Sequence, residues 1–367
     1  MADEAEAGSS ASSAEPAARA ELQRTLAAAL ARVPGASALL TLECLRAATA
    51  PSPALQHTVF YVTGFLTQDE AESAQSAARV AALHEALPLD PAALSLVRVA
   101  WASGSAGAAL SAAHATAAAG GALGVARMVA SLSPAYHLGM AVYSLVGGGG
   151  GGQPAAPSPW DELDFRAKHR HAKDVGVALG GVLQQLAAGE PGAAAAAAAA
   201  PPPRRVLLGH SLGGRVVLHA LAALAPPAGQ RQQRPAVAAA AVFGAAQAGP
   251  EDRAEVWGAA LRALPPAGGA LFNVFNPRDP ALSAMGTLGR VLQVDGWARH
   301  LPAGLRPVAA PPAQQEHQCQ LVNVDASPYF EGEGGPGGAG SYVHSYRTAY
   351  MQLLRCERMA PLFAGAQ

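Results

Sequence analysis

Short apolar segments alternate with helical segments along most of this 367-residue chain. Most of the apolar segments are rich in β-branched, leucine or aromatic residues and are bounded by turn-forming residues, as buried strands are. An alternation of this kind predicts a mostly parallel sheet with helices on both faces, an α/β fold. The predicted strands are 57–65, 96–101, 205–209, 238–243, 271–275 and 321–324, and the predicted helices are 69–87, 161–188, 212–224, 251–264 and 342–356.

Composition narrows the class of protein. Half of the residues are hydrophobic, 14% are charged and the formal net charge is −1. This balance disfavours a wholly disordered chain, and it disfavours nucleic acid as the main partner because phosphate binding needs a concentrated excess of Lys and Arg. The three cysteines, Cys44, Cys319 and Cys356, are far apart and odd in number, so they predict neither a disulfide framework nor a CxxC zinc site.

Several motifs are absent from the sequence. It contains no GxxxxGK[ST] loop, no GxGxxG after a strand, no HExxH and no calcium-binding loop, so we predict no cofactor and no metal. The first residues are acidic and rich in Ala and Ser, unlike a secretory signal or a transit peptide. We therefore expect an intracellular protein, cytoplasmic or membrane-associated, that is not secreted.

Low-complexity segments divide the chain. Runs of Gly, Ala and Pro do not build a packed layer and usually lie in surface loops. We expect one α/β domain at 57–356, since no internal repeat divides it. The other predicted parts are a disordered tail at 1–16, an N-terminal helical extension at 17–56, an Ala-rich helical insertion at 104–160 and a C-terminal tail at 357–367, with loop expansions at 147–159, 189–203 and 331–340.

The segment 104–146 leaves two interpretations open. Residues 105–126 carry no charge over a length that could span a bilayer. They are mostly Ala, Gly and Ser, however, whereas Leu, Ile, Phe and Val drive membrane insertion. A helical pair packed on the domain is the favoured interpretation, and a membrane-inserted hairpin is the alternative.

The sequence Gly209-His210-Ser211-Leu212-Gly213 directly follows the predicted strand 205–209. A G-x-S-x-G string between a strand and an apolar helix is typical of a nucleophile elbow, a sharp turn that lifts a serine hydroxyl above the sheet edge. The helix that begins at Leu212 directs its N–H groups toward the place where an oxyanion would form. The alternative is a strand–turn–helix junction whose glycines serve only close packing.

A serine nucleophile needs a base and an acid that orients the base. In this architecture they follow the serine in the order acid, then histidine, at the ends of later strands. His344 is the predicted base, because His317 precedes the last strand. Asp279, after the strand 271–275, is the predicted acid, and Asp325 is the alternative acid. A turn residue at 279 and a helix-cap residue at 344 are the structural alternatives.

The first predicted strand ends at Gly64-Phe65-Leu66. An oxyanion hole requires a second backbone N–H besides the one that follows the nucleophile, and it comes from the loop after this strand. We predict the N–H groups of Leu212 and Phe65 as the oxyanion donors, with Leu66 as the alternative to Phe65. An ordinary strand-ending glycine at Gly64 is the structural alternative.

Together these features resemble an α/β-hydrolase, and within that superfamily the transmembrane-and-coiled-coil-domain-containing hydrolase-like family. The resemblance covers roughly residues 57–355. The matching pieces are Gly64-Phe65-Leu66, Asp69, the strand ending at Trp101, the Gly-x-Ser-Leu-Gly motif, the Asn276–Asp279 turn and the sequence Asn323–Asp325. The resemblance implies a serine-hydrolase-like domain, often membrane-associated, with Ser211, Asp279 and His344 in the catalytic positions.

The predicted function is therefore a serine hydrolase, esterase- or lipase-like, that cleaves a small-molecule or lipid ester. The apolar insertion lies where hydrolases often carry a lid, which by analogy of fold favours a hydrophobic substrate. The alternative is a catalytically relaxed scaffold associated with membranes. It is suggested by Val343, which stands where the family usually has Gly.

Overall fold

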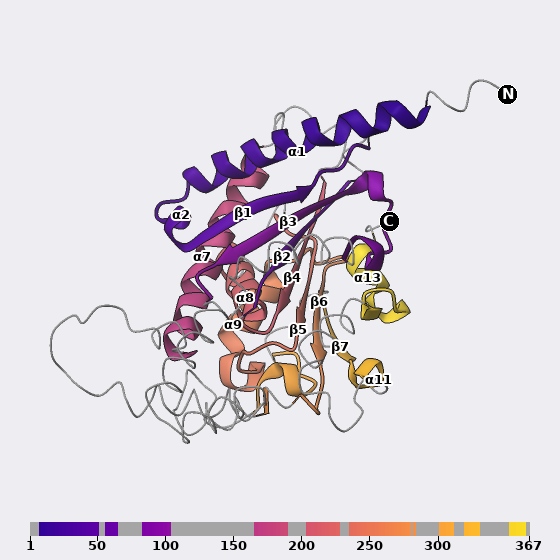
Figure 1. Cartoon of the computed structure of the whole chain (residues 1–367). Helices are drawn as coiled ribbons and strands as arrows, with labels where there is room; N and C mark the ends of the chain where they lie inside the picture. The colour runs from indigo at the N-terminus through magenta and orange to yellow at the C-terminus, as the bar shows by residue number, and fades with distance from the viewer. Residues whose placement is uncertain are drawn as a thin grey trace, which may run out of the picture.

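A computed structural model gives the fold of the chain (Figure 1). The residues that the structure describes are 7–50, 56–64, 83–103, 165–189, 203–227, 235–279, 282–283, 301–311, 319–330 and 352–364. The predicted insertion 104–160, residues 69–82 of the predicted helix 69–87, residues 342–351 of the predicted helix 342–356 and nearly all of the loop expansions therefore lie outside the described residues.

The described residues form one seven-stranded sheet with the strand order β1-β3-β2-β4-β5-β6-β7. All neighbouring strands run parallel except the β1–β3 pair at one edge. The strands are β1 (Leu40–Arg46), β2 (His57–Val62), β3 (Leu94–Trp101), β4 (Arg204–His210), β5 (Ala239–Phe243), β6 (Ala270–Phe275) and β7 (Gln320–Asp325). The helices are α1 (Ala7–Ala31), α2 (Ala36–Leu39), α7 (Phe165–Ala188), α8 (Leu212–Leu224), α9 (Pro250–Arg262), α11 (Ser327–Phe330) and α13 (Ala360–Phe363), and the 3-10 turns are η2 (Pro91–Ala93), η5 (Ala303–Leu305) and η7 (Glu357–Met359).

The central strands are apolar on both faces because helices cover both. β5 and β6 are buried along their whole length. Alternate residues of β4 enter different cores: Leu207 packs with residues of α7 and α8, and Leu208 packs with the residues around α13. Figure 1 shows α7, α8 and α9 on one side of the sheet and α13 on the other. The strand order, with one antiparallel edge strand and a crossover between β2 and β3, is an α/β-hydrolase topology.

All six predicted strands are confirmed, each within three residues at either end. The helix over 212–224 is confirmed at both ends, and the helix predicted over 161–188 is present as α7. Its predicted apolar stripe is confirmed as well, since Val175, Leu179, Val182 and Leu186 are all buried.

The structure differs from the prediction at both ends of the domain. α1 begins at Ala7, inside the predicted disordered tail. β1, which the prediction of a helical extension missed, is an edge strand with alternating burial. At the other end, the predicted tail 357–367 contains η7 and α13, which pack into the core through buried Met359 and Leu362. At both ends of the domain, apolar residues are buried by segments that are distant in the sequence. Contacts of this kind leave no periodic pattern in the local sequence, so they could not be predicted from it.

Side chains of α1 close the outer edge of β1. The Gln23 carboxamide donates to the Leu42 carbonyl oxygen (2.9 Å) and accepts from the Cys44 N–H (2.7 Å), as one residue of a parallel neighbouring strand would do. Arg19 Nε donates to the Cys44 carbonyl oxygen (2.8 Å). An open sheet edge invites pairing with other chains, so α1 protects this edge.

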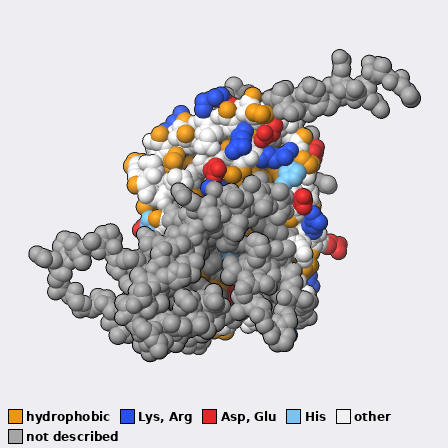
Figure 2. Space-filling model, in the orientation of Figure 1, with side chains coloured by type: hydrophobic (Ala, Val, Ile, Leu, Met, Phe, Trp, Pro, Cys, Tyr) orange, Lys and Arg blue, Asp and Glu red, His pale blue; other side chains and the backbone are white. Residues whose placement is uncertain are grey.

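On the face shown in Figure 2, Lys and Arg side chains of the described residues are interspersed with Asp and Glu side chains. No helix among the described residues is both long enough and apolar enough to cross a membrane.

Candidate active site

Ser211 lies in the turn between β4 and α8 and has a strained backbone. Its φ of 55° and ψ of −120° make it the only non-glycine residue with positive φ in the part of the chain that the structure describes. Such a conformation costs of order 1–3 kcal/mol and persists only where its surroundings enforce it. The side chain is partly exposed, at the carboxyl edge of the parallel strands. This is the backbone geometry expected of a nucleophile elbow.

Glycines make this turn possible because neighbouring backbone lies against them. A Cβ at Gly209 would overlap with the Gly213 carbonyl group and lie 2.8 Å from the Gly214 nitrogen. A Cβ at Gly213 would overlap with the Val62 carbonyl oxygen and lie 2.7 Å from that of Thr63. Separations below 3.0 Å require the backbone to move. The glycines therefore serve close packing, and that same packing holds the strained serine.

Backbone hydrogen bonds fix the Ser211 peptide groups from two sides. The Ser211 N–H donates to the Phe243 carbonyl oxygen at the end of β5 (2.9 Å). The Ser211 carbonyl oxygen accepts from the N–H of Gly214 (3.0 Å) and of Ala246 (3.1 Å). The turn is therefore tied both to its own helix and to the segment that follows β5.

The first residue of α8, Leu212, is fully buried. Its N–H belongs to the first turn of the helix, where backbone N–H groups and the positive end of the helix dipole favour an anion. Gly64 follows β2, and a Cβ placed on it would lie 3.3 Å from the Ser211 Cβ. The loop that begins at Gly64 thus starts beside the serine. Phe65, the predicted second oxyanion donor, and Leu66 lie outside the described residues.

Asp279 lies in the turn after β6, and only 2% of its surface is exposed. Its Oδ1 accepts from the Leu282 N–H (3.0 Å), and its own N–H donates to the Asn276 carbonyl oxygen (3.1 Å). The Asn276 Oδ1 accepts from the Arg278 N–H (3.0 Å). The side chains of Asn276 and Asp279 thus shape this turn, as the Asx-type alternative predicts. The same turn buries the Asp279 carboxyl group at the edge of the sheet where Ser211 lies.

Asp325, the alternative acid, ends β7 and is exposed. Its Oδ1 accepts from the Ser327 N–H (2.8 Å) at the start of α11, so the carboxylate caps that short helix. The structure therefore gives the two aspartates different environments, one buried and one open to solvent. His344, the predicted base, lies outside the described residues, as does His317.

Thiol groups are poor alternatives to the serine. Burial raises the pKa of the Cys44 thiol to about 11 and that of the Cys319 thiol to about 12. A thiol reacts as its thiolate, so both cysteines are held in the unreactive form near neutral pH. Among the residues that the structure describes, no group of three or more His, Cys, Asp or Glu side chains could hold a metal ion.

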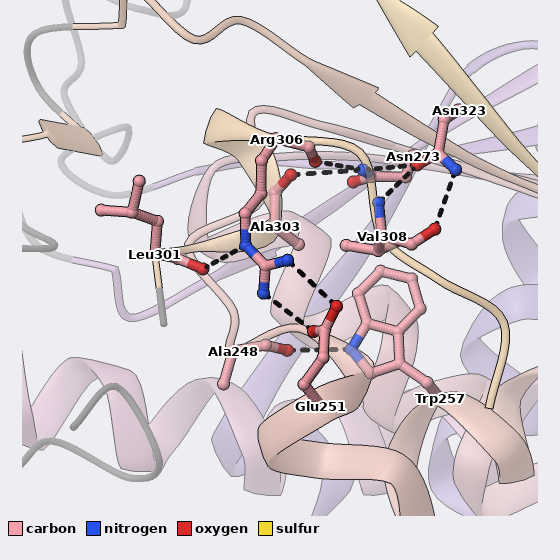
Figure 3. A network of polar contacts seen from close by, with 9 residues as sticks. All are labelled: Ala248, Glu251, Trp257, Asn273, Leu301, Ala303, Arg306, Val308 and Asn323. Atoms are coloured by element: carbon pink, nitrogen blue, oxygen red, sulfur yellow. Dashed lines mark hydrogen bonds and ion pairs between the residues drawn. The ribbon is translucent and has the colours of Figure 1, made fainter. Parts of the chain in front are cut away.

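Sequence reasoning missed the segment 301–308, whose contacts with the two asparagines and with Glu251 are drawn in Figure 3. The side chains of Asn273 in β6 and Asn323 in β7 hold its backbone, and Arg306 within it forms a bidentate ion pair with Glu251. The one available signal was an asparagine in the middle of each of two neighbouring strands, of which β6 is buried and β7 is partly buried. Amides are rarely buried without hydrogen-bond partners, so such a pair indicates a segment bound to them.

Three solved structures are distant likenesses of this chain. No protein-family model and no curated protein matches the chain. A dienelactone hydrolase-like promiscuous phosphotriesterase from metagenomic libraries is 12% identical, over 86% of this chain and 97% of that one, with a TM-score of 0.29. A lipase/esterase from Lactobacillus plantarum is 14% identical, over 89% and 99%, with a TM-score of 0.30. A siderophore hydrolase from Aspergillus nidulans is 12% identical, over 87% and 91%, with a TM-score of 0.25.

These TM-scores are too low to carry an argument, so the fold assignment rests on the order and direction of the strands. Membership in the transmembrane-and-coiled-coil-domain-containing hydrolase-like family stays a prediction, since no family model matches.

Proposed function

We propose that this protein is a serine hydrolase of the esterase or lipase type, with Ser211 as nucleophile, His344 as base and Asp279 as the acid that orients the base. The strained backbone of Ser211, partly exposed at the carboxyl edge of the sheet, is the observation that carries the proposal. Strain of this kind is retained where the surroundings enforce it, and it clusters at active sites.

The choice of Asp279 over Asp325 rests on burial and chain order. A carboxylate that orients a histidine acts most strongly where water does not screen it, and Asp279 is the buried one of the two. Ser211 follows β4, Asp279 follows β6, and His344 comes after β7 in the chain. This order of serine, acid and histidine is the one that the α/β-hydrolase architecture uses.

The reaction proceeds in two steps. The Ser211 Oγ attacks the ester carbonyl while His344 takes its proton, and the N–H groups of Leu212 and Phe65 stabilise the tetrahedral oxyanion. His344 then returns the proton to the leaving alcohol, which leaves an acyl-serine. Water attacks the acyl-serine with His344 as base again, and this step releases the acid and regenerates the serine.

A hydrophobic ester is the proposed substrate class, and membrane association through 104–146, the alternative to helices packed on the domain, is proposed with it. The support is the composition of that segment, in which residues 105–126 carry no charge, and its place in the chain after β3. Flotation of the full chain with phosphatidylcholine vesicles tests the membrane part. Protein that stays at the bottom of the gradient would exclude it without touching the hydrolase proposal.

Hydrolysis of p-nitrophenyl butyrate and octanoate by the purified chain tests the proposed activity. Ser211→Ala and His344→Ala are expected to lower kcat by at least about 10⁴-fold, with a larger kcat/KM for the longer ester in the wild type. Ser37→Ala, at an exposed position of α2, is the matched control and is expected to leave the rate unchanged. A folded wild-type protein that hydrolyses neither ester would favour the scaffold alternative.

A further inference from the structure

We propose that residues 301–308, here called the strap, are a positioning element that sets the spacing between the turn of Ser211 and the turn of Asp279, with Gly304 as the residue that joins the two turns. The inference rests on the proposed function for its catalytic meaning. It rests on backbone hydrogen bonds between described residues for its structure.

Gly304 connects to the acid turn through its carbonyl group and to the β5 side through its N–H. The Gly304 carbonyl oxygen accepts from the Asn276 N–H (2.9 Å), and the Asn276 carbonyl oxygen accepts from the Asp279 N–H (3.1 Å). The Gly304 N–H donates to the Ala245 carbonyl oxygen (3.1 Å). One residue of the strap therefore holds the first residue of the acid turn and the segment that follows β5.

The connection continues to the serine through a single peptide group. The peptide that joins Ala245 to Ala246 accepts from Gly304 through its oxygen and donates to the Ser211 carbonyl oxygen through its N–H (3.1 Å). A chain of backbone hydrogen bonds thus runs from Ser211 to Asp279, and Gly304 lies in it. Rigid backbone contacts of this kind hold catalytic groups within the few tenths of an ångström that the chemistry requires.

Only glycine fits at position 304. A Cβ there would overlap with the Gly244 carbonyl carbon and lie 2.5 Å from the Ala245 nitrogen. Both contacts are to backbone, which cannot rotate away as a flexible side chain can. The strap therefore approaches the β5 segment as closely as two backbones can, and any larger residue would push the two turns apart.

The two asparagines fasten the strap to the sheet (Figure 3). Asn273 and Asn323 are paired in register on β6 and β7, and the Asn273 Nδ2 donates to the Asn323 Oδ1 (3.1 Å). Asn273 also donates to the carbonyl oxygens of Ala303 (3.2 Å) and Arg306 (3.0 Å). Asn323 accepts from the Val308 N–H (2.8 Å) and donates to the Val308 carbonyl oxygen (2.9 Å), so its carboxamide binds the strap as a neighbouring strand would.

The strap positions the two turns but takes no part in the reaction itself. No strap side chain is needed to touch a substrate, because the strap acts on the turns through its backbone. Displacing it is therefore expected to lower kcat, which depends on the distance between the triad groups, and to leave KM nearly unchanged, since the substrate-binding surface is not altered.

Gly304→Ala in the full chain is the test, with Gly258→Ala as the matched control. A Cβ at Gly258 in α9 meets only the end of the Arg262 side chain at 3.5 Å. Amide hydrogen exchange is measured in both proteins, together with kcat and KM for p-nitrophenyl butyrate. We expect exchange at 244–248 and at 275–279 to accelerate together in Gly304→Ala, and kcat to fall about 10-fold or more with KM within twofold. The control should match the wild type in all three.

Asn323→Ala provides a second variant in case Gly304→Ala does not fold. It removes both hydrogen bonds to Val308 and is expected to give the same paired acceleration of exchange and a smaller fall in kcat. Exchange that changes only within 301–308, or a kcat equal to that of the wild type, would overturn the proposal. A wild-type chain without esterase activity would instead refute the proposed function, while the exchange data would still report whether the strap couples the two turns.

Discussion

The turns that carry Ser211 and Asp279 lie at the same edge of the sheet but are built in different ways. The Ser211 turn is marked in the sequence by contiguous residues, with glycines at 209 and 213 that admit neighbouring backbone, and the segment after β5 binds it through backbone hydrogen bonds. The Asp279 turn is shaped by the Asn276 and Asp279 side chains and is held from outside by a later part of the chain, through Gly304. The Ser211 turn can therefore be recognised from a short string of sequence, whereas the position of Asp279, the proposed acid, depends on a segment that no local pattern identifies.

The sharpest contrast is expected between the two aspartates. Asp279→Asn keeps the shape of the side chain but removes the charge that orients the base, so kcat should fall by about 10⁴-fold. Asp325→Asn changes an exposed helix cap and should leave kcat within a factor of about two. The measurement is steady-state hydrolysis of p-nitrophenyl butyrate. The reverse ranking would transfer the acid role to Asp325 and break the comparison between the two turns.

The Ser211 turn is not expected to tolerate a side chain at Gly213. Gly213→Ala would force a Cβ against the backbone of Val62 and Thr63, which should lower the free energy of unfolding by about 3 kcal/mol. Gly258→Ala adds the same methyl group inside a helix with room for it, and it should be neutral or stabilising by up to about 1 kcal/mol. Urea unfolding of both variants gives the comparison. A Gly213→Ala protein as stable as the wild type would show that the turn is not packed as described.

The Asp279 turn is expected to depend on Asn273, which binds the strap that holds this turn. Asn273→Leu has similar volume but removes the donor to Ala303 and Arg306, and it leaves buried carbonyl oxygens without that hydrogen bond. The expected loss of stability is about 1–3 kcal/mol, with kcat reduced by more than the loss of folded protein explains. Urea unfolding and active-site titration of the folded fraction measure the two effects. Unchanged kcat per folded molecule would contradict the dependence.

The smallest effect is expected at the outer side of the strap. Arg306 forms a bidentate pair with Glu251 at 3.0 and 2.8 Å, but both side chains are partly open to solvent. Glu251→Gln should therefore lower the free energy of unfolding by only about 0.5 kcal/mol, and high salt should reduce the difference. Urea unfolding at low and high salt checks this. A loss of several kcal/mol would mean that the ion pair, and not the asparagine pair, fastens the strap.

Much of the fold could be predicted because its strands are short, apolar and separated by helices with clear periodicity. β4, Ser211 and α8 were predicted together, since the strand, the turn and the helix are adjacent in sequence. β1 could not be predicted in the same way. Its alternation Leu40, Leu42, Cys44 gains its meaning only from β3 on one side and from Gln23 on the other.

In the candidate site, too, features encoded by adjacent residues could be predicted and features that depend on distant residues could not. The sequence predicted Ser211 and Asp279 in turns that follow strands and Leu212 as the first residue of a helix, and the structure has these residues in those positions. It offered Asp325 as an alternative acid because chain order alone does not report burial. It could not predict the strap, whose contacts to Asn273 and the acid turn are made by backbone groups that any residue type can supply.

Reaction of the folded chain with a fluorophosphonate, followed by peptide mass analysis, tests the central claim most directly. We expect one adduct per molecule, on Ser211, that is absent in Ser211→Ala and forms far more slowly in Asp279→Asn and His344→Ala. A folded wild-type chain that takes no adduct, or an adduct that persists in Ser211→Ala, would contradict the proposed role of Ser211.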